Sequence, residues 1–187
     1  MARPLSEEAR QKALDASQQV IADHGIERFT VDAVSKQSGV AKSTIYRHWP
    51  NGSALLIDSI GCMVTHFATP NTGSLHQDLR ELMMQVLPVM ADDTMRRTIT
   101  GLVAATTSDP ELSEIHQAMM RERMRPISTI VELAQARGEV RPDLDLALAL
   151  DFVEGPLFFR TMVKGEQMTK QGVDDLVDLI VAGLTNI

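Results

Sequence analysis

The segment GVAKSTIYRHW, residues 39–49, concentrates side chains that can donate hydrogen bonds. Ammonium, guanidinium and hydroxyl donors at this density suit the phosphates and base edges of a duplex. The segment therefore raises the hypothesis of DNA binding. A solvated polar helix, with its two large aromatic rings merely packed, is the alternative. The polar and aromatic positions are Lys42, Ser43, Thr44, Tyr46, Arg47, His48 and Trp49.

The charge of the chain is unevenly divided. The formal net charge is −7, which argues against a protein that coats nucleic acid without regard to sequence. Residues 1–50 hold 7 Lys and Arg against 6 Asp and Glu, whereas residues 51–187 hold 11 against 19. The acidic part can suppress non-specific binding, because that affinity comes from neutralising phosphates.

The composition predicts a soluble, cytoplasmic protein. Apolar residues make up 44% of 187 residues, enough for a sizeable core. No apolar run has the length of a membrane span, and the N-terminus MARPLSEEAR lacks the apolar stretch of a signal peptide. Cys62 is the single cysteine, which rules out an internal disulfide and fits a reducing compartment.

Apolar residues recur at helical spacing almost throughout, so we predict an all-α fold of about nine helices. Gly25 and Gly39 end the first two helices, and residues 109–138 read as one long helix bent at Pro126. The alternating leucines of residues 144–150 also fit a strand, but capping aspartates and alanines favour helix. We expect two domains, residues 1–50 and residues 51–187.

Two short helices near the N-terminus have the layout of a helix-turn-helix. Thr30 opens the first, a glycine turn follows, and the second runs from about Ala41 to His48. The second helix of such a unit enters the major groove. This role requires Val40 and Ile45 to face inward while the donor side chains project outward.

The segment TVDAVSKQSGVAKSTIYRHWPNGSALL, residues 30–56, resembles the N-terminal domain of the tetracycline-repressor (TetR/AcrR) family of bacterial transcriptional regulators. GPLFFRTMV, from Gly155 to Val163, is similar to C-terminal helices in one branch of that family. The resemblance implies a three-helix DNA-binding domain followed by a larger helical domain for ligand binding and dimerisation. It also implies a regulator, most simply a ligand-responsive repressor.

The resemblance assigns roles to individual residues. It implies phosphate contacts for Thr30, Tyr46 and His48, and base or flanking phosphate contacts for Lys42, Ser43, Thr44 and Arg47. Two departures stand out. Gly52 lies where the family often carries a phosphate-binding lysine, and Ser35 and Ser38 replace small apolar residues, from which we expect a slightly wetter helix packing.

A helix-turn-helix protein needs a second, identical subunit to bind a palindromic operator, whose half-sites lie roughly 34–36 Å apart. The last two helices carry apolar stripes that suit a four-helix bundle between two subunits, although these stripes also fit an ordinary intrachain core. Family resemblance favours the homodimer. The candidate interface residues are Phe152, Gly155, Phe159, Val173, Val177, Ile180 and Leu184.

Methionines are concentrated in the middle of the chain, where eight of the eleven lie between residues 60 and 125. Flexible, polarizable side chains suit a cavity for a small, largely apolar effector, and they equally suit gap-filling in a loose core. The candidate effector-binding residues are Met63, His66, Phe67, Met83, Leu87, Met90, Leu102 and Met119.

The remaining polar residues predict neither a metal site, nor a cofactor, nor a catalytic centre. The five histidines lack metal-ligand spacing, and no local signature of a catalytic triad is recognisable. We therefore expect a regulator rather than an enzyme. One alternative is a small-molecule-binding or enzymatic helical protein with a vestigial helix-turn-helix. Another is a ligand-independent architectural or activator protein.

Overall fold

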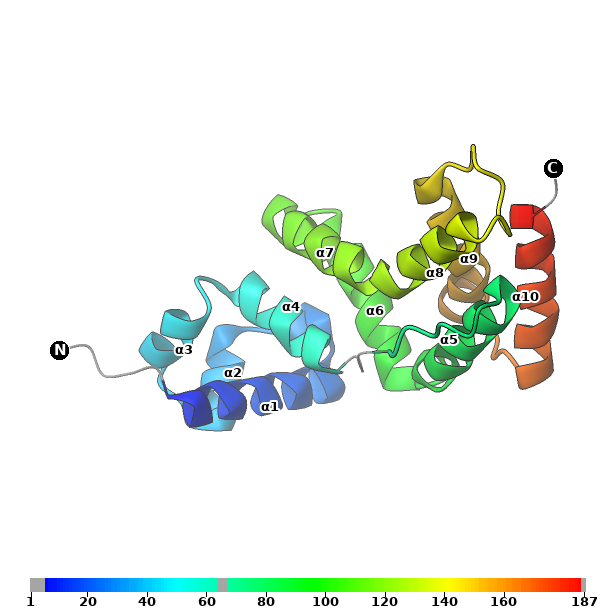
Figure 1. The fold of residues 1–187 in the computed structure, drawn as a ribbon. Coiled ribbons are helices and arrows are strands. Elements are labelled where there is room, and N and C mark those ends of the chain that lie inside the picture. The colour runs from blue at the N-terminus through cyan, green and yellow to red at the C-terminus, as the bar shows by residue number, and fades with distance from the viewer. Residues whose placement is uncertain (1–5, 64–66, 186–187) are drawn as a thin grey trace. The chain divides into compact units, whose positions relative to one another are not determined.

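The computed structural model describes residues 6–63 and 67–185, and all regular structure in these ranges is helical (Figure 1). The predicted all-α class is confirmed, with ten α-helices in the described residues. The bounds are α1 Glu7–His24, α2 Val31–Ser38, α3 Lys42–His48, α4 Gly52–Met63, α5 Leu75–Met90, α6 Asp93–Thr106, α7 Pro110–Arg123, α8 Arg125–Ala136, α9 Leu146–Phe158 and α10 Lys170–Thr185, with a 3-10 turn at Ile26–Arg28 and a π turn at Phe159–Val163.

The helix count differs from prediction because the expected long helix over residues 109–138 is two helices, α7 and α8. Pro126 lies in the first turn of α8, with Met124 as its N-cap residue. Proline is tolerated in a first turn, where its missing N–H has no helical partner, but it cannot continue a helix from the preceding turn. Leu146, Leu148 and Leu150 are helical, as predicted, whereas Leu144 precedes the first residue of α9.

The chain divides into two compact units, one of Met1–Thr65 with Arg97–Met120 and one of His66–Arg96 with Arg121–Ile187. In the first unit, α1 packs against α2, α3 and α4. Its core joins Leu14 of α1, Val34 of α2, Ile45 of α3 and Leu55 of α4. The compact unit thus extends past residue 50, and the expected boundary at 50/51 stays a prediction.

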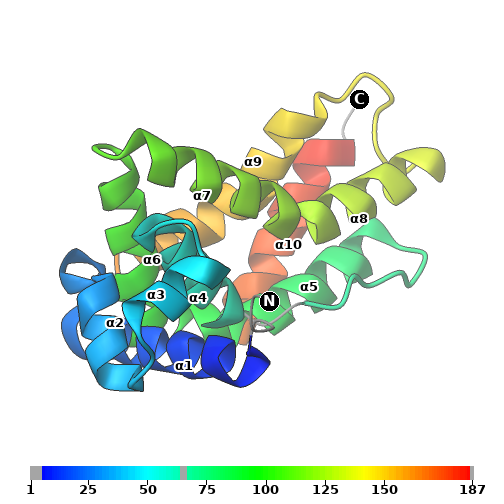
Figure 2. The ribbon, with the colours of Figure 1, turned by 90° about the vertical axis from the view of Figure 1, so that its left-hand side faces the viewer.

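The second unit is built on α5 and α10, which lie side by side, with α8 against α5 and α9 against α8 and α10 (Figures 1 and 2). Its core draws leucines from α5, Ile130 from α8, Val153 from α9 and the apolar stripe of α10. No helix in the described residues is both long enough and apolar enough to cross a bilayer.

Candidate DNA-binding surface

The turn between α2 and α3 is fastened by serine side chains. Gly39 takes a left-handed conformation, φ 69°, that most other residues disfavour. The Ser35 hydroxyl donates to the Val40 carbonyl at 2.7 Å. The Ser38 hydroxyl donates to the Val34 carbonyl and accepts from the Val40 N–H. These hydrogen bonds close the turn between α2 and α3, and the slightly wetter packing expected from the two serines stays a prediction.

Helix α3 turns its apolar side inward and its donors outward. Ile45 is 1% exposed, and Val40 before the helix and Trp49 after it are also buried. On the opposite side Lys42, Ser43, Tyr46 and Arg47 are exposed, and Thr44 is half-buried. This is the orientation that entry into a major groove requires.

Helix α2 begins beside this surface with its cap in place. The Thr30 hydroxyl oxygen accepts from the Ala33 N–H at 3.1 Å, which satisfies one of the free amide groups of the first turn. The hydroxyl proton of the exposed Thr30 remains to donate to a phosphate oxygen. The phosphate role that resemblance implies for Thr30 therefore agrees with its geometry.

Two other candidate DNA-contacting residues, Lys42 and His48, already contact neighbouring side chains. The ammonium of Lys42 lies 2.5 Å from a carboxylate oxygen of Asp32 in α2. The ring of His48 packs on Trp49 with 5.4 Å between centroids, and its Nε2 is buried without a hydrogen-bond partner in the described structure. A phosphate contact from His48 in this conformation has to use Nδ1.

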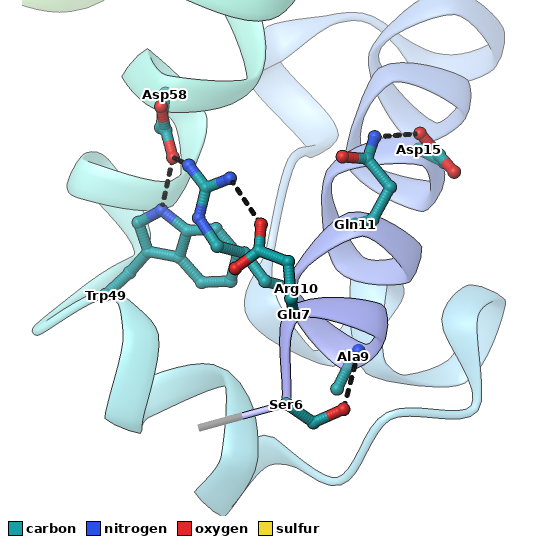
Figure 3. A network of polar contacts seen from close by, with 8 residues as sticks. All are labelled: Ser6, Glu7, Ala9, Arg10, Gln11, Asp15, Trp49 and Asp58. Atoms are coloured by element: carbon teal, nitrogen blue, oxygen red, sulfur yellow. Dashed lines mark hydrogen bonds and ion pairs between the residues drawn. The ribbon is translucent and has the colours of Figure 1, made fainter. Parts of the chain in front are cut away.

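A polar network holds the end of α3 to α1 and α4 (Figure 3). One oxygen of Asp58, on α4, accepts from the Trp49 indole N–H at 2.9 Å and from the Arg10 guanidinium at 2.7 Å. The guanidinium also lies 5.7 Å from the Trp49 ring centroid and 3.5 Å from Glu7. Sequence reasoning missed Arg10 and Asp58, because they are 48 residues apart in the chain.

Two family models match the chain. One, described as bacterial regulatory proteins, tetR family, matches residues 13–58. The other, described as tetracyclin repressor-like, C-terminal domain, matches residues 69–180, which is more than half of the chain. The chain belongs to the TetR family. The family resemblance inferred from residues 30–56 is thereby confirmed.

Individual relatives agree. The chain is 28% identical over 179 residues to the uncharacterised HTH-type transcriptional regulator YdeS of Bacillus subtilis, covering 94% of this chain and 89% of that protein. The TetR family transcription regulator SCO0332 has a TM-score of 0.74 at 26% identity, covering 96% of this chain and 100% of that one. FadR of Bacillus subtilis, solved with stearoyl-CoA, shares the fold, with a TM-score of 0.70 at 20% identity over 94% of this chain and 99% of that one.

The chain is therefore a helix-turn-helix transcriptional regulator of the TetR family, and the relatives bear out the expectation of a regulator rather than an enzyme. Its Gly52 is the first residue of α4. A Cβ at this position would lie 3.4 Å from a Val31 methyl group, an ordinary packing distance. The fold therefore accepts a Cβ at the position where the family often carries a lysine.

The candidate dimer residues of this TetR-family regulator fall into two groups. Val173, Val177, Ile180 and Leu184 of α10 are at most 2% exposed and form the intrachain core with α5, α8 and α9. A side chain buried within its own subunit offers little surface to a partner, so these four residues are core residues of the subunit, and their part in a subunit interface stays a prediction. An apolar stripe alone does not tell which neighbour covers it.

The remaining candidates lie on an uncovered apolar face. Phe152 and Phe159 are exposed, and nothing lies within 4 Å of the position of a Cβ at Gly155. The close approach of α9 and α10 occurs instead at Gly183, where a Cβ would lie 2.8 Å from the Phe152 ring. The outward apolar residues of α9 and of the π turn after it, which we call the α9 face, are Leu148, Phe152, Phe159 and Val163. Leu179 of α10 is also exposed.

The candidate effector residues lie in different clusters. Met83 is buried in the core of the second unit, with Phe67 and Leu87 packed against that core. Leu102 and Met119 belong to a cluster with Ile21 and Ile60 of the first unit. Met90 is buried at the end of α5. The side chain of Met63 and the whole of His66 lie outside the described residues, so an effector role for all eight stays a prediction.

Proposed function

We propose that this TetR-family regulator is a ligand-responsive repressor that binds a palindromic operator as a homodimer. The observation that carries the proposal is the orientation of α3. Its hydroxyl and cationic side chains face outward, while Ile45 and Trp49 are buried in the core on the opposite side. A binder of operator DNA acts where the chromosome lies, so we place the protein in the cytoplasm.

The α9 face supports the dimer. Leu148 and Phe159 are 64% and 56% exposed, and Val163 extends the same stripe into the π turn. Exposed apolar residues that recur at helical spacing are typical of protein interfaces when they form a patch. Two copies meeting through α9 and α10 would form a four-helix bundle and set the separation of two α3 helices.

A small, largely apolar effector is the second partner that we propose. The methionine-rich segments α5 and α7 supply flexible side chains. The stearoyl-CoA of the FadR structure makes acyl-CoA compounds a sensible first class to test. An effector releases DNA only if it binds the DNA-incompetent conformation more tightly, with a coupling free energy of typically about 1–3 kcal/mol.

Fluorescence anisotropy with labelled DNA from beside the protein's own gene tests the DNA role. We expect tight, salt-sensitive binding that Tyr46→Ala and Arg47→Ala each weaken by about tenfold or more. Gln77→Ala, an exposed change in α5, serves as the control. Weak binding to every duplex, unaffected by the α3 variants, would instead support a vestigial helix-turn-helix.

The same assay tests the effector. Acyl-CoA and other apolar compounds are added to the preformed complex, and we expect one class to lower the anisotropy at concentrations that leave a control DNA-binding protein unaffected. If no compound changes the affinity for DNA, the proposal of ligand-responsive repression fails and a ligand-independent architectural protein or activator is favoured.

A further inference from the structure

Lys42, the first residue of α3, forms an ion pair with Asp32 in the first turn of α2. Lys42 Nζ and Asp32 Oδ1 are 2.5 Å apart, and the two side chains are 52% and 71% exposed. A pair this exposed contributes little to folding. Its position, between two elements that the proposed function places against DNA, gives it significance for binding.

The ion pair changes what Lys42 can bind. An ammonium group has three donors, so a lysine that gives one to Asp32 keeps two for another acceptor. Phosphate carries a negative charge, which the Asp32 carboxylate repels at close range. The guanine edge offers neutral acceptors, O6 and N7, which a lysine can bind without bringing a second anion beside the carboxylate.

We propose that Asp32 is a specificity-determining residue, whose carboxylate neutralises Lys42 so that this lysine reads a guanine edge instead of binding phosphate. The inference rests on the proposed function, because it requires α3 to lie in the major groove. Asp32 lowers the affinity for all DNA and raises the preference for the operator, since sequence-independent affinity comes from phosphate neutralisation.

A purely structural role for Asp32 predicts the opposite change in the affinity of an Asp32 variant for unrelated DNA. An acidic residue in the first turn of a helix stabilises that helix through its dipole. If this were its whole contribution, Asp32→Asn would loosen α2, lower Tm and weaken binding to every duplex. The specificity role requires tighter binding of Asp32→Asn to unrelated DNA.

The experiment compares two duplexes, one selected by the wild-type protein from a randomised library and one unrelated. For Asp32→Asn we expect the affinity for unrelated DNA to rise about threefold to tenfold, and the logarithmic salt slope to steepen by about 0.9, as one more phosphate contact requires. The ratio of the two affinities should fall about tenfold, the loss of one guanine contact. Asp143→Asn, an exposed change of the same charge in the second unit, controls for net charge. It should alter neither the salt slope nor the ratio of the two affinities.

A double-mutant cycle with Lys42→Ala assigns the effect to the ion pair. In the Lys42→Ala background, Asp32→Asn should change the specificity ratio by less than about twofold. The proposal is overturned if Asp32→Asn lowers the specificity ratio about tenfold in the Lys42→Ala background as well. It is also overturned if Asp32→Asn alone leaves the ratio unchanged or weakens binding to both duplexes. If Tyr46→Ala and Arg47→Ala leave the selected duplex equally well bound, the proposed function itself has failed, and the inference fails with it.

Discussion

Gly52 is the single residue whose replacement should most directly strengthen DNA binding. It begins α4, and a Cβ there would make only an ordinary contact with Val31. We expect Gly52→Lys to add one phosphate contact, which steepens the logarithmic salt slope by about 0.9. Anisotropy titrations over a series of salt concentrations measure the slope. Gly52→Ala is the control for backbone effects, and equal slopes for the two variants would contradict the prediction.

Glu154 is a residue whose charge opposes folding. Burial raises the pKa of this carboxyl group above 4.5, an effect that Asp151 reinforces and Arg123 only partly offsets. The folded state therefore holds the proton more tightly than the unfolded state, and stability falls as pH rises from about 4.5 through the folded pKa. Glu154→Gln should raise Tm relative to wild type at pH 7, with the gain vanishing near pH 4.

Thermal denaturation of both proteins across this pH range checks the sign. Glu114→Gln, an exposed change of the same kind in α7, is the matched control. A difference in Tm between Glu154→Gln and wild type that is the same at pH 4 and pH 7 would rule out titration of Glu154 as the cause.

At the scale of elements, α3 is a short helix whose position depends on its attachments. Asp58 joins the indole of Trp49 and the guanidinium of Arg10 at one oxygen atom. Asp58→Ala removes two charge-assisted hydrogen bonds, each of which contributes on the order of 1 kcal/mol at this partial exposure. We expect the variant to fold and to bind operator DNA about tenfold more weakly, because the end of α3 is no longer fixed.

Trp49 is the only tryptophan in the chain, so its fluorescence reports on this network. Its emission should shift to longer wavelength in Asp58→Ala as the buried indole becomes wetter. Asp15→Asn, at a carboxylate that accepts from Gln11 on α1 (Figure 3), is the control. Unchanged emission together with unchanged affinity would show that the network does not position α3.

The helices were predictable because their signals are local. Apolar spacing, capping by Thr30 and the glycine at 39 are all written within a few residues of the elements that they define. The partner of a helical stripe is not local, which is why Ile180 was assigned to a dimer and lies in the core. Asp32 and Asp58 were missed for the same reason, since each acts on a residue of another element.

At the scale of the whole molecule, the α9 face has to be covered if the protein binds a palindrome. Phe159→Asp places a charge in its middle without disturbing the core, because the side chain is 56% exposed. We expect sedimentation to show a dimer for wild type and a monomer for the variant, with loss of operator binding. Val103→Asp, at another exposed apolar position, should remain dimeric. A dimeric Phe159→Asp would place the interface elsewhere.

Guanine methylation interference tests the central claim most directly, because guanine N7 lies in the major groove. If two copies of α3 enter adjacent major grooves, N7 methylation should block binding at two patches whose centres are about 10–10.5 base pairs apart, and Arg47→Ala or Lys42→Ala should erase part of each. The absence of interference by N7 methylation, or a single patch unaffected by either substitution, would contradict the account.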